Sequence, residues 1–574
     1  MSASSGQQRD LFAVRVDSPG RVRVRAGLVR SPGKAVTMAM EDVTCVPDDA
    51  NCAGQAALPV GEARDAVDVA GFLASGRAFG PEGPVCRIDT HAASIFLTGR
   101  RAWKVKRPVA LGYLDFTTVE QRRVALESEL RLNRRTAPDL YLALHPITRT
   151  SDGMLSIGGE GEIVDWVLEM RRFPDGALLA EQVELGPLAP GLLAALVDRI
   201  HAFHAAAEIV DGEPASARLR HVIVGNADRF AAYAAHLDLH AAAEVLAMQR
   251  DRLDLLAPLL DRRGRHGRVR HCHGDLHLAN IAMIEGAPVP FDCIEFDPEL
   301  ACIDVLYDLA FLIMDLWHRD HHDAANQVFN RYLDLSAEDE AGAPLMPLFL
   351  SVRAAVRAHV CAERASRTGT RDDTALAHDY LRLAGELLTP VAPRLVAIGG
   401  RSGTGKSTLA LALAPAIGAP PGARILRTDV LRKRRAGVPP EARLPRNHYT
   451  PQSSREVYAD LAATCETALR GGASVIADAA FLMLEERRGI EEAAAGRRVT
   501  FTGLWLEAGE AVRCARVAAR ERDASDADTA IVRLQTRRSC GPLERWHRLR
   551  ASGPPEQVRA SAERLLKPDA GCRG

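Results

Sequence analysis

Two short segments of this 574-residue chain combine residue types that can handle phosphate groups. Residues 273–280 read HGDLHLAN, and residues 400–407 read GRSGTGKS. The first segment holds a carboxylate, Asp275, and an amide, Asn280, which suit proton transfer and cation binding. The second is rich in glycine and ends in a lysine and a serine, which suits a backbone loop around phosphate oxygens. Both segments therefore point to phosphate chemistry, at two separate places in the chain.

The spacing in the first segment matches the needs of phosphoryl transfer. That reaction requires an acceptor hydroxyl held in line, a base beside it and a metal ion that screens the phosphate charge. In the pattern HxD-xxxx-N, Asp275 accepts the hydroxyl proton and Asn280 reaches a metal. Asp292 follows between apolar residues in VPFDCIEF, which we interpret as a strand, and is a candidate second metal ligand. Two oxygen donors completed by phosphate oxygens suit Mg²⁺.

A phosphate-holding lysine is expected on a strand upstream of this segment. The stretch RAWKVK offers Lys104 and Lys106, which are two residues apart and therefore lie on the same strand face. We favour Lys104. Its glutamate partner is expected on the following helix, where Glu127 and Glu129 point in roughly opposite directions. Periodicity does not decide between these two glutamates.

These residues resemble the aminoglycoside phosphotransferase branch of the protein-kinase-like fold, over residues 61–388. The stretches THAASIFLTGRRAWKVKRPVALGYLDF, ELRLNRRTAPDLYL and FDCIEFDPEL resemble, more narrowly, a bacterial group in which such a domain is fused to a P-loop domain. The resemblance implies ATP as donor, Asp275 as catalytic residue, Asn280 and Asp292 as metal ligands, and Glu129 as the helix glutamate. No GxGxxG loop precedes Lys104, and DCIEF replaces DFG. The implied acceptor is therefore a hydroxyl of a small molecule, such as a cationic metabolite or an aminoglycoside, and a domain that binds ATP without turnover is the alternative.

The second segment has the flanking elements of a P-loop. The apolar strand LVAIGG precedes it and the helical stretch STLALALA follows it. Lys406 is expected to reach the phosphates, and the Ser407 hydroxyl to bind Mg²⁺. The candidate nucleotide-binding residues of this loop are Gly400, Ser402, Gly403, Thr404, Gly405, Lys406, Ser407 and Thr408.

Four further residues complete the second constellation. Asp478 ends the strand ASVIAD, as a metal-binding carboxylate of a P-loop protein does, and Asp429 ends ARILRTD, where a carboxylate can activate an acceptor hydroxyl. Arg516 and Arg520 are four residues apart on a predicted helix and either clamp phosphates from a lid or form a solvated basic face. TDVLRK and VIADAAF resemble P-loop small-molecule kinases such as gluconate kinase, polynucleotide kinase and zeta-toxin-like proteins. The resemblance implies that Asp429 is a general base and that both arginines belong to a lid.

The elements around these motifs predict two different folds. Short strands over residues 86–109, a helix over 119–135, a strand over 163–170 and helices up to residue 388 indicate an α+β kinase-like domain. Strands that alternate with helices after residue 391 indicate an α/β P-loop domain with a doubly wound parallel sheet. The segment TPVAPR at 389–394 is the predicted joint. The predicted domains are therefore 61–388 and 391–574, after a disordered extension at 1–60.

The composition limits the classes of binding partner and the cellular location that we expect. A net charge of −1 and an aromatic content of 5% disfavour nucleic acid. Eleven cysteines without a CxxC pair are typical of a reducing cytoplasm, and no apolar run approaches the ~20 residues of a membrane span. We therefore expect a cytoplasmic ATP- and Mg²⁺-dependent phosphotransferase with two nucleotide sites and a small-molecule substrate, and its oligomeric state stays open. The alternative is one catalytic domain regulated by ATP bound to the other.

Overall fold

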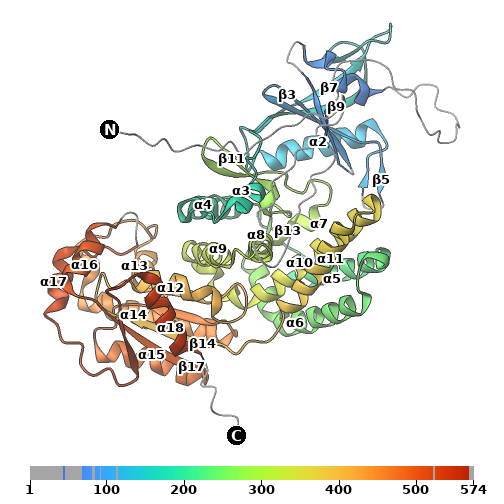
Figure 1. Cartoon of the computed structure of the whole chain (residues 1–574). Helices are drawn as coiled ribbons and strands as arrows, with labels where there is room; N and C mark the ends of the chain where they lie inside the picture. The colour runs from blue at the N-terminus through green and yellow to red at the C-terminus, as the bar shows by residue number, and fades with distance from the viewer. Residues whose placement is uncertain are drawn as a thin grey trace, which may run out of the picture. The chain divides into compact units, whose positions relative to one another are not determined.

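The computed structural model describes residues 43–45, 68–80, 84–90, 92–111, 114–520 and 524–567. The chain forms two compact units, one up to Asp175 and one from Gly176 onward (Figure 1). The joint predicted at 389–394 falls inside the second unit, and the three predicted domains stay a prediction. Within the segment 1–60, for which we predicted disorder, residues 43–45 form a strand, and the rest of that segment lies outside the described residues.

The first unit is built on an antiparallel sheet. Its strands, in spatial order, are β1 (Val43–Cys45), β2 (Cys86–Asp89), β3 (Ala93–Thr98), β4 (Arg101–Lys106), β9 (Glu162–Arg171), β7 (Tyr141–Arg149) and β8 (Leu155–Ile157). One face packs on α1 (Val69–Ala74) and η1 (Arg77–Phe79) through an apolar cluster that includes Val105. Helix α2 (Val119–Asn133) packs against β4, β7 and β9 (Figure 1). Thr118 and Gln121 cap it reciprocally. A two-residue hairpin, β5 (Ala110–Leu111) and β6 (Leu114–Asp115), lies between β4 and α2 in the chain.

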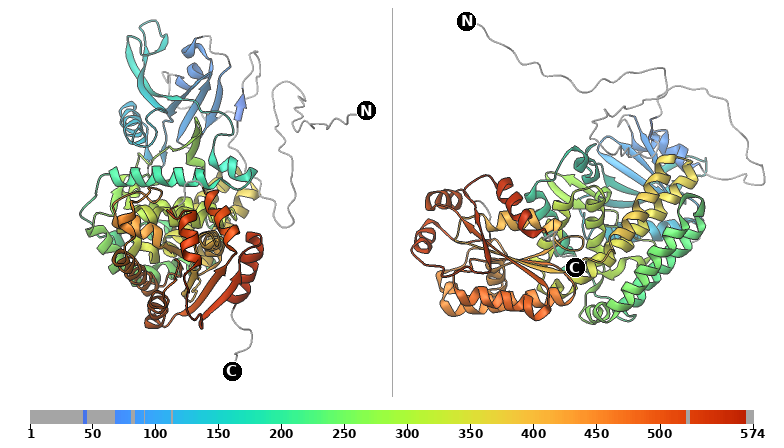
Figure 2. Two further views of the ribbon diagram at one scale, coloured as in Figure 1. Left: turned by 90° about the vertical axis from the view of Figure 1, so that its left-hand side faces the viewer. Right: turned by 60° about the horizontal axis from the view of Figure 1, so that its bottom comes forward.

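The second unit begins with a helical part around one large apolar core. Its helices are α3 (Leu179–Leu185), α4 (Pro190–Ala206), α5 (Ala215–Ala232), η2 (Ala234–His236), α6 (Leu239–Arg265), η3 (Leu278–Asn280), α7 (Pro298–Ala301), α8 (Val305–His318), α9 (His322–Leu335), η4 (Ala337–Leu345), α10 (Met346–Thr368) and α11 (Arg371–Glu386). Figure 2 shows the long α6 alongside α5. Helix α8 is buried from Val305 to Leu316. It therefore forms the centre of this part.

Two small strand pairs carry the HGD segment. Strand β10 (Val269–His271) pairs with β13 (Cys302–Asp304), and β11 (Ile281–Ile284) forms a hairpin with β12 (Ala287–Pro290). The strand predicted over VPFDCIEF is thus wrong beyond Pro290, since residues 291–297 have no regular structure. Asp292 has a φ of +64°, a backbone conformation that is rare outside glycine and incompatible with a continuing strand.

One described helical run, 337–368, is long and apolar enough by length and composition to cross a membrane. Its most apolar 18-residue window is 72% buried within the protein. The core helix of a soluble protein passes the same test.

The P-loop part has the predicted doubly wound parallel sheet, which is confirmed. The strands lie in the order β15 (Arg424–Arg427), β16 (Val475–Asp478), β14 (Arg394–Gly399), β17 (Thr500–Glu507) and β18 (Trp546–Arg550), all parallel. Alternate residues of β14 point to opposite faces, because Leu395 and Ala397 join one apolar core and Val396 and Ile398 join another. The helices of this part are α12 (Lys406–Leu413), η5 (Ala414–Ala416), α13 (Thr428–Arg435), η6 (Arg446–Tyr449), α14 (Pro451–Arg470), α15 (Leu484–Arg497), α16 (Glu510–Ala518), α17 (Thr529–Thr536) and α18 (Pro555–Leu566).

Within the second unit, α9 covers the edge strand of the P-loop sheet. The Asn330 side chain accepts from the Ile425 N–H at 2.7 Å and donates to the Ala423 carbonyl at 3.1 Å. Asn326, one turn earlier, donates to the carbonyls of Pro421 and Ala423. Since an open sheet edge leaves backbone groups unpaired, these two asparagines take the place of a neighbouring strand. This joins the P-loop sheet to the helical part.

Candidate functional site

In the first unit, both candidate lysines bind the same buried glutamate. The Lys104 Nζ lies 2.6 Å from Glu129 Oε1, and the Lys106 Nζ lies 2.8 Å from Glu129 Oε2. Glu129 is fully buried, whereas Glu127 is on the exposed side of α2 and pairs with Arg123. Burial alone would raise the pKa of Glu129, but the two ammonium charges outweigh it and hold that pKa below its usual value. Lys104 is the more exposed lysine, with 12% of its side chain accessible against 3% for Lys106.

In the second unit, the HGD segment brings Asp275 and Asn280 together. The Asn280 amide donates to Asp275 Oδ2 at 2.8 Å and to the Asp275 carbonyl at 3.0 Å. His277 Nε2 lies 3.3 Å from the same Oδ2. Burial alone would raise the pKa of Asp275, yet His277, Arg357 and His273 together hold it well below its usual range. A carboxylate that stays ionised and keeps 36% of its side chain exposed can accept a proton from a hydroxyl.

The β11–β12 hairpin brings the residue before Asp292 to Asn280. Asn280 directly precedes β11, and Phe291, which follows β12, donates its N–H to the Asn280 carbonyl at 2.9 Å. Since the Asn280 amide nitrogen is turned toward Asp275, its amide oxygen is available as a ligand. An amide oxygen and a carboxylate are the oxygen donors that Mg²⁺ takes, so the residues fit that ion.

Two buried aspartates of α8 hold the backbone of the HGD segment. Asp308 accepts the N–H groups of His273 and Gly274 at 3.0 and 2.9 Å, and Asp315 accepts that of Leu278 at 3.0 Å. Charge-assisted bonds of this kind are stronger than neutral ones. Gly274 has a φ of +85°, and a Cβ there would lie 2.8 Å from the Ile294 side chain, so a larger residue at this position would be strained.

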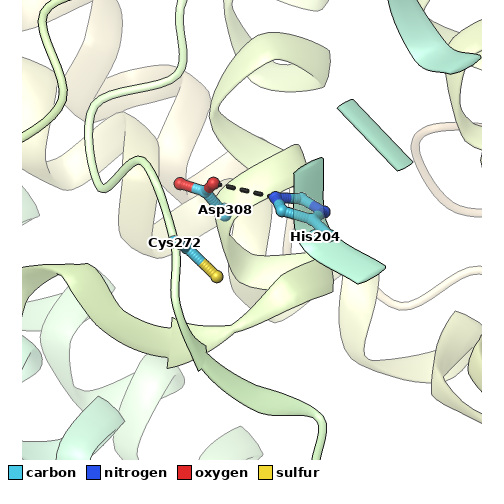
Figure 3. Close-up of side chains that lie close together, drawn as sticks. All are labelled: His204, Cys272 and Asp308. Atoms are coloured by element: carbon cyan, nitrogen blue, oxygen red, sulfur yellow. Dashed lines mark hydrogen bonds and ion pairs between the residues drawn. The ribbon is translucent and has the colours of Figure 1, made fainter. Parts of the chain in front are cut away.

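The group His204, Cys272 and Asp308 has the residue types of a metal site (Figure 3). The His204 ring already bonds to Asp308 at 3.0 Å and to the Tyr332 hydroxyl at 2.9 Å. Both oxygens of Asp308 are also occupied by the loop N–H groups. We therefore interpret this group as a support of the HGD segment and not as a metal centre.

The P-loop wraps around the N-terminus of α12. Gly403 has a φ of +85°, and a Cβ there would lie 2.5 Å from the Arg513 carbonyl, so the loop needs glycine at this position. The Ser407 hydroxyl donates to Asp478 Oδ2 at 2.6 Å, which leaves the hydroxyl lone pairs for a metal, so this pair also fits Mg²⁺. Burial lowers the pKa of Lys406, while the charges of Asp478 and Asp429 raise it.

The other predicted loop residues differ in their surroundings. Ser402 donates its N–H to Gln535 Oε1 of α17 at 2.7 Å, and the buried Thr404 hydroxyl donates to the Arg401 carbonyl at 2.8 Å. Gly400 and Gly405 both have positive φ, and Thr408 is exposed. The helix α17 therefore contacts the tip of the loop.

Asp429 and the two predicted lid arginines, Arg516 and Arg520, have different surroundings. Asp429 lies in the first turn of α13, and burial raises its pKa. The Arg516 guanidinium donates to the carbonyls of Thr404 and Ala551 at 3.3 and 2.8 Å. Arg520 lies beyond the end of α16, so the prediction of one shared helix face is wrong. Its charge nevertheless lowers the pKa of Lys406.

Sequence reasoning assigned no role to His204, Asp315 and Arg357. A usable signal was the sequence of α8, where Asp308 and Asp315 stand seven residues apart in an otherwise apolar helix. Carboxylates are almost never fully buried unless they are paired, so their partners had to be found nearby.

The chain is similar to known proteins over most of its length. A family model described as an AAA domain matches residues 395–542. The uncharacterized protein Rv2004c of Mycobacterium tuberculosis is 31% identical over 485 residues, which cover 82% of this chain and 93% of that protein. The uncharacterized protein Mb2027c of Mycobacterium bovis matches equally well.

Solved structures give weaker matches. A gluconokinase from Sinorhizobium meliloti is 21% identical over 30% of this chain and 93% of its own, with a TM-score of 0.23. A choline/ethanolamine kinase family protein from Mesorhizobium loti is 14% identical over 56% of this chain and 95% of its own, with a TM-score of 0.32. At these values the likenesses carry no argument about function. The extent of the mycobacterial match shows that the chain belongs to the same family as these two mycobacterial proteins, and residues 395–542 of this chain match the AAA domain model.

Proposed function

We propose that the chain is an ATP-dependent phosphotransferase with two nucleotide sites. One site, around Asp275, phosphorylates a hydroxyl group of a small molecule. The other, around Lys406, is a P-loop kinase or NTPase. A cytoplasmic location belongs to the same proposal and rests on composition alone.

In the second unit, Asp275 accepts the proton of the acceptor hydroxyl, and Asn280 and Asp292 hold Mg²⁺. In the first unit, Lys104, oriented by Glu129, binds the ATP phosphates, while Lys106 is the more deeply buried partner of the same glutamate. The bound metal ion would neutralise phosphate charge. The chain itself contributes positioning and an ionised base.

At the second site the loop residues 400–408 hold the phosphates, with Lys406 as the cation. Ser407 and Asp478 would hold Mg²⁺, and Asp429 is the candidate base. Arg516 and Arg520 are the candidate cations of a lid. The bond between Ser407 and Asp478 supports this assignment, because it ties the loop to the end of the neighbouring strand.

The contact of the Asn280 amide with Asp275 Oδ2 at 2.8 Å is the observation that supports the proposal. The backbone bond from Phe291 to the Asn280 carbonyl ties the residue before Asp292 to the same segment, and Asp308 holds the N–H groups of His273 and Gly274. The alternative, in which one site is catalytic and the other is an ATP-binding regulatory module, keeps the same residues.

Transfer of label tests the proposal. The full-length protein is incubated with γ-labelled ATP, Mg²⁺ and a bacterial small-molecule extract, next to the Asp275→Asn and Lys406→Ala variants. We expect a labelled small molecule that Asp275→Asn lowers by roughly 10²- to 10⁴-fold, the usual contribution of a general base. Release of inorganic phosphate alone, unchanged by Asp275→Asn, would contradict a phosphotransferase at this site. Loss of every activity in Lys406→Ala would favour the regulatory alternative.

A further inference from the structure

The second unit contains a cavity of about 420 Å³ where the C-terminal end of α6 meets η4. Its charged lining comprises four basic side chains and one acidic side chain: Arg262, Arg263, His266, Arg268 and Glu338. None of these residues belongs to either of the phosphate sites proposed above. Pockets that bind small molecules have volumes of about 300–1,000 Å³. The cavity therefore has the size for a small molecule and the excess of basic groups for an anion.

Two of the basic side chains have no counter-ion in the described part of the chain. Arg262 and His266 are four residues apart at the end of α6 and therefore lie on one face of the helix. Across the described residues, no hydrogen bond or ion pair engages either side chain. The partial negative charge of a helix C-terminus favours cations in general, and this effect accounts for Arg265, which lies outside the cavity. It does not account for a cavity lined by such groups, so we interpret Arg262 and His266 as donors for a ligand.

Arg263 adds a fixed positive charge to the cavity wall. Its Nε and Nη2 donate to the two oxygens of Asp304, each at 2.8 Å, and Nη2 also donates to Asp339 at 2.8 Å. Among the described residues, its third nitrogen, Nη1, has no hydrogen-bond partner. A Cβ at Gly342 would lie 2.6 Å from Nη1, so glycine at this position leaves room for the guanidinium. Arg263 is therefore held rigidly, with one donor unused.

Arg268 joins the cavity to the same buried network through one firm bond and one replaceable bond. Its Nε donates to the buried Asp339 at 2.9 Å, and its Nη1 donates to Glu338 at 2.8 Å. The side chain of Glu338 is 76% exposed, and an ion pair with an exposed partner contributes little to stability. A phosphate group presents several charged oxygens to a planar guanidinium and binds it well. A phosphate can therefore displace Glu338 from Arg268 while Asp339 keeps the arginine in place.

We propose that this cavity binds a small molecule that carries a phosphate group. Arg262, His266 and the Nη1 of Arg268 are its donors, and Glu338 turns into solvent when the phosphate binds. Three basic donors match a phosphate dianion better than the single charge of a carboxylate. The site goes beyond the proposed phosphotransferase function and does not depend on it.

The position of the cavity gives its ligand a structural effect. Glu338 and Asp339 are followed in η4 by Glu340, which accepts from Arg424 of the P-loop sheet at 2.8 Å. A ligand that bridges α6 and η4 therefore stabilises the segment that holds this sheet. Its binding should raise the melting temperature of the second unit.

Calorimetry of the full-length protein with glycerol 3-phosphate tests the site. Both nucleotide sites are first saturated with Mg²⁺ and a non-hydrolysable ATP analogue, so that they do not take up the phosphate. Glycerol is the neutral match of this probe, and glycerate is its match with a carboxylate. The variants are Arg262→Met and Glu338→Gln. The control is Arg265→Met, which removes the same charge from the same helix end outside the cavity, and melting temperatures without ligand verify that the variants fold.

We expect glycerol 3-phosphate to bind and to raise the melting temperature, and glycerol to do neither. Arg262→Met should weaken the binding by about 10- to 100-fold, the value of a hydrogen bond to a charged group, whereas Arg265→Met should leave it unchanged. Glu338→Gln should strengthen the binding by about 2- to 5-fold, because the competing carboxylate is gone.

Three results would overturn the inference. The first is a lack of binding of glycerol 3-phosphate at millimolar concentration. The second is an equal loss in Arg262→Met and Arg265→Met, which would indicate a general effect of charge and no site. The third is tighter binding of glycerate than of glycerol 3-phosphate, which would exclude phosphate as the preferred group. Weaker binding in Glu338→Gln would refute the exchange at Arg268.

Discussion

Replacement of Arg424 by methionine should loosen the P-loop sheet from the helical part of the second unit. Arg424 opens β15 and is 1% exposed. Its guanidinium binds both oxygens of Glu340 at 2.8 and 3.0 Å, and Asp334 at 2.8 Å. It also donates to the Asn330 side chain at 3.0 Å. Methionine fills a similar volume but leaves these carboxylates without their main cation.

The expected loss of stability in Arg424→Met follows from the burial of the Arg424 ion pairs. Removal of one partner of a buried ion pair costs about 3–5 kcal/mol, because the other charge stays buried without compensation. In a domain of 150–250 residues, 1 kcal/mol corresponds to a change in melting temperature of about 2–4 °C. Arg424→Met should therefore lower the melting temperature of the P-loop part by roughly 6–20 °C. Arg434 lies 3.5 Å from Glu340 and offsets part of the loss, which places the result in the lower half of that range.

Calorimetry of the full-length protein measures this change. The matched control is Arg382→Met, because Arg382 pairs with Glu386 at 2.6 Å but is 51% exposed, and exposed pairs contribute about 0–1 kcal/mol. The double variant Arg424→Met with Glu340→Leu should recover part of the loss, since a buried pair exchanged for apolar residues is often neutral. A shift no larger than that of the Arg382 control would refute the assignment of a buried network to Arg424.

Three further outcomes follow from the sites. Glu129→Gln should lower phosphate transfer at the Asp275 site by about 10²-fold, the effect of a misplaced phosphate-binding group. Glu127→Gln, on the exposed side of α2, should leave the rate unchanged. Equal effects of the two variants in the initial-rate assay would contradict the role of Glu129 as the partner of the lysines. A general base works only when deprotonated, and the pKa of Asp429 is raised while that of Asp275 is lowered. The acidic limb of the pH–rate profile should therefore lie at higher pH for the P-loop site than for the Asp275 site, each measured with the other site silenced, and coincident limbs would argue against these two bases. A chelator should abolish transfer by removing Mg²⁺ but leave the melting temperature unchanged, because the group His204, Cys272 and Asp308 holds no structural metal: the oxygens of Asp308 are used by hydrogen bonds. Zinc retained in elemental analysis of the purified protein would contradict this.

The regular patterns of the sequence predicted much of the fold. Strands β2, β3, β4 and β9 lie where alternation predicted them, and α2 begins at residue 119, as predicted. The parallel order of the P-loop sheet follows from alternation of strands and helices, and is confirmed. Strand β7 was missed because Pro146 interrupts its pattern.

The sequence alone could not predict features that depend on tertiary contacts. The α2 period left Glu127 and Glu129 equivalent, and only the packing of α2 on the sheet buries one of them. The end of β12 at Pro290 was missed because an apolar run does not show where a strand stops. The contact of Asn326 and Asn330 with the edge strand joins segments almost a hundred residues apart, and no local pattern predicts it.

Equilibrium binding of a labelled, non-hydrolysable ATP analogue to the full-length protein tests the central claim of two independent nucleotide sites. The account predicts two molecules bound per chain, with one site lost in Lys406→Ala and the other weakened in Lys104→Met. A single bound molecule per chain, or loss of both sites in either variant, would contradict it.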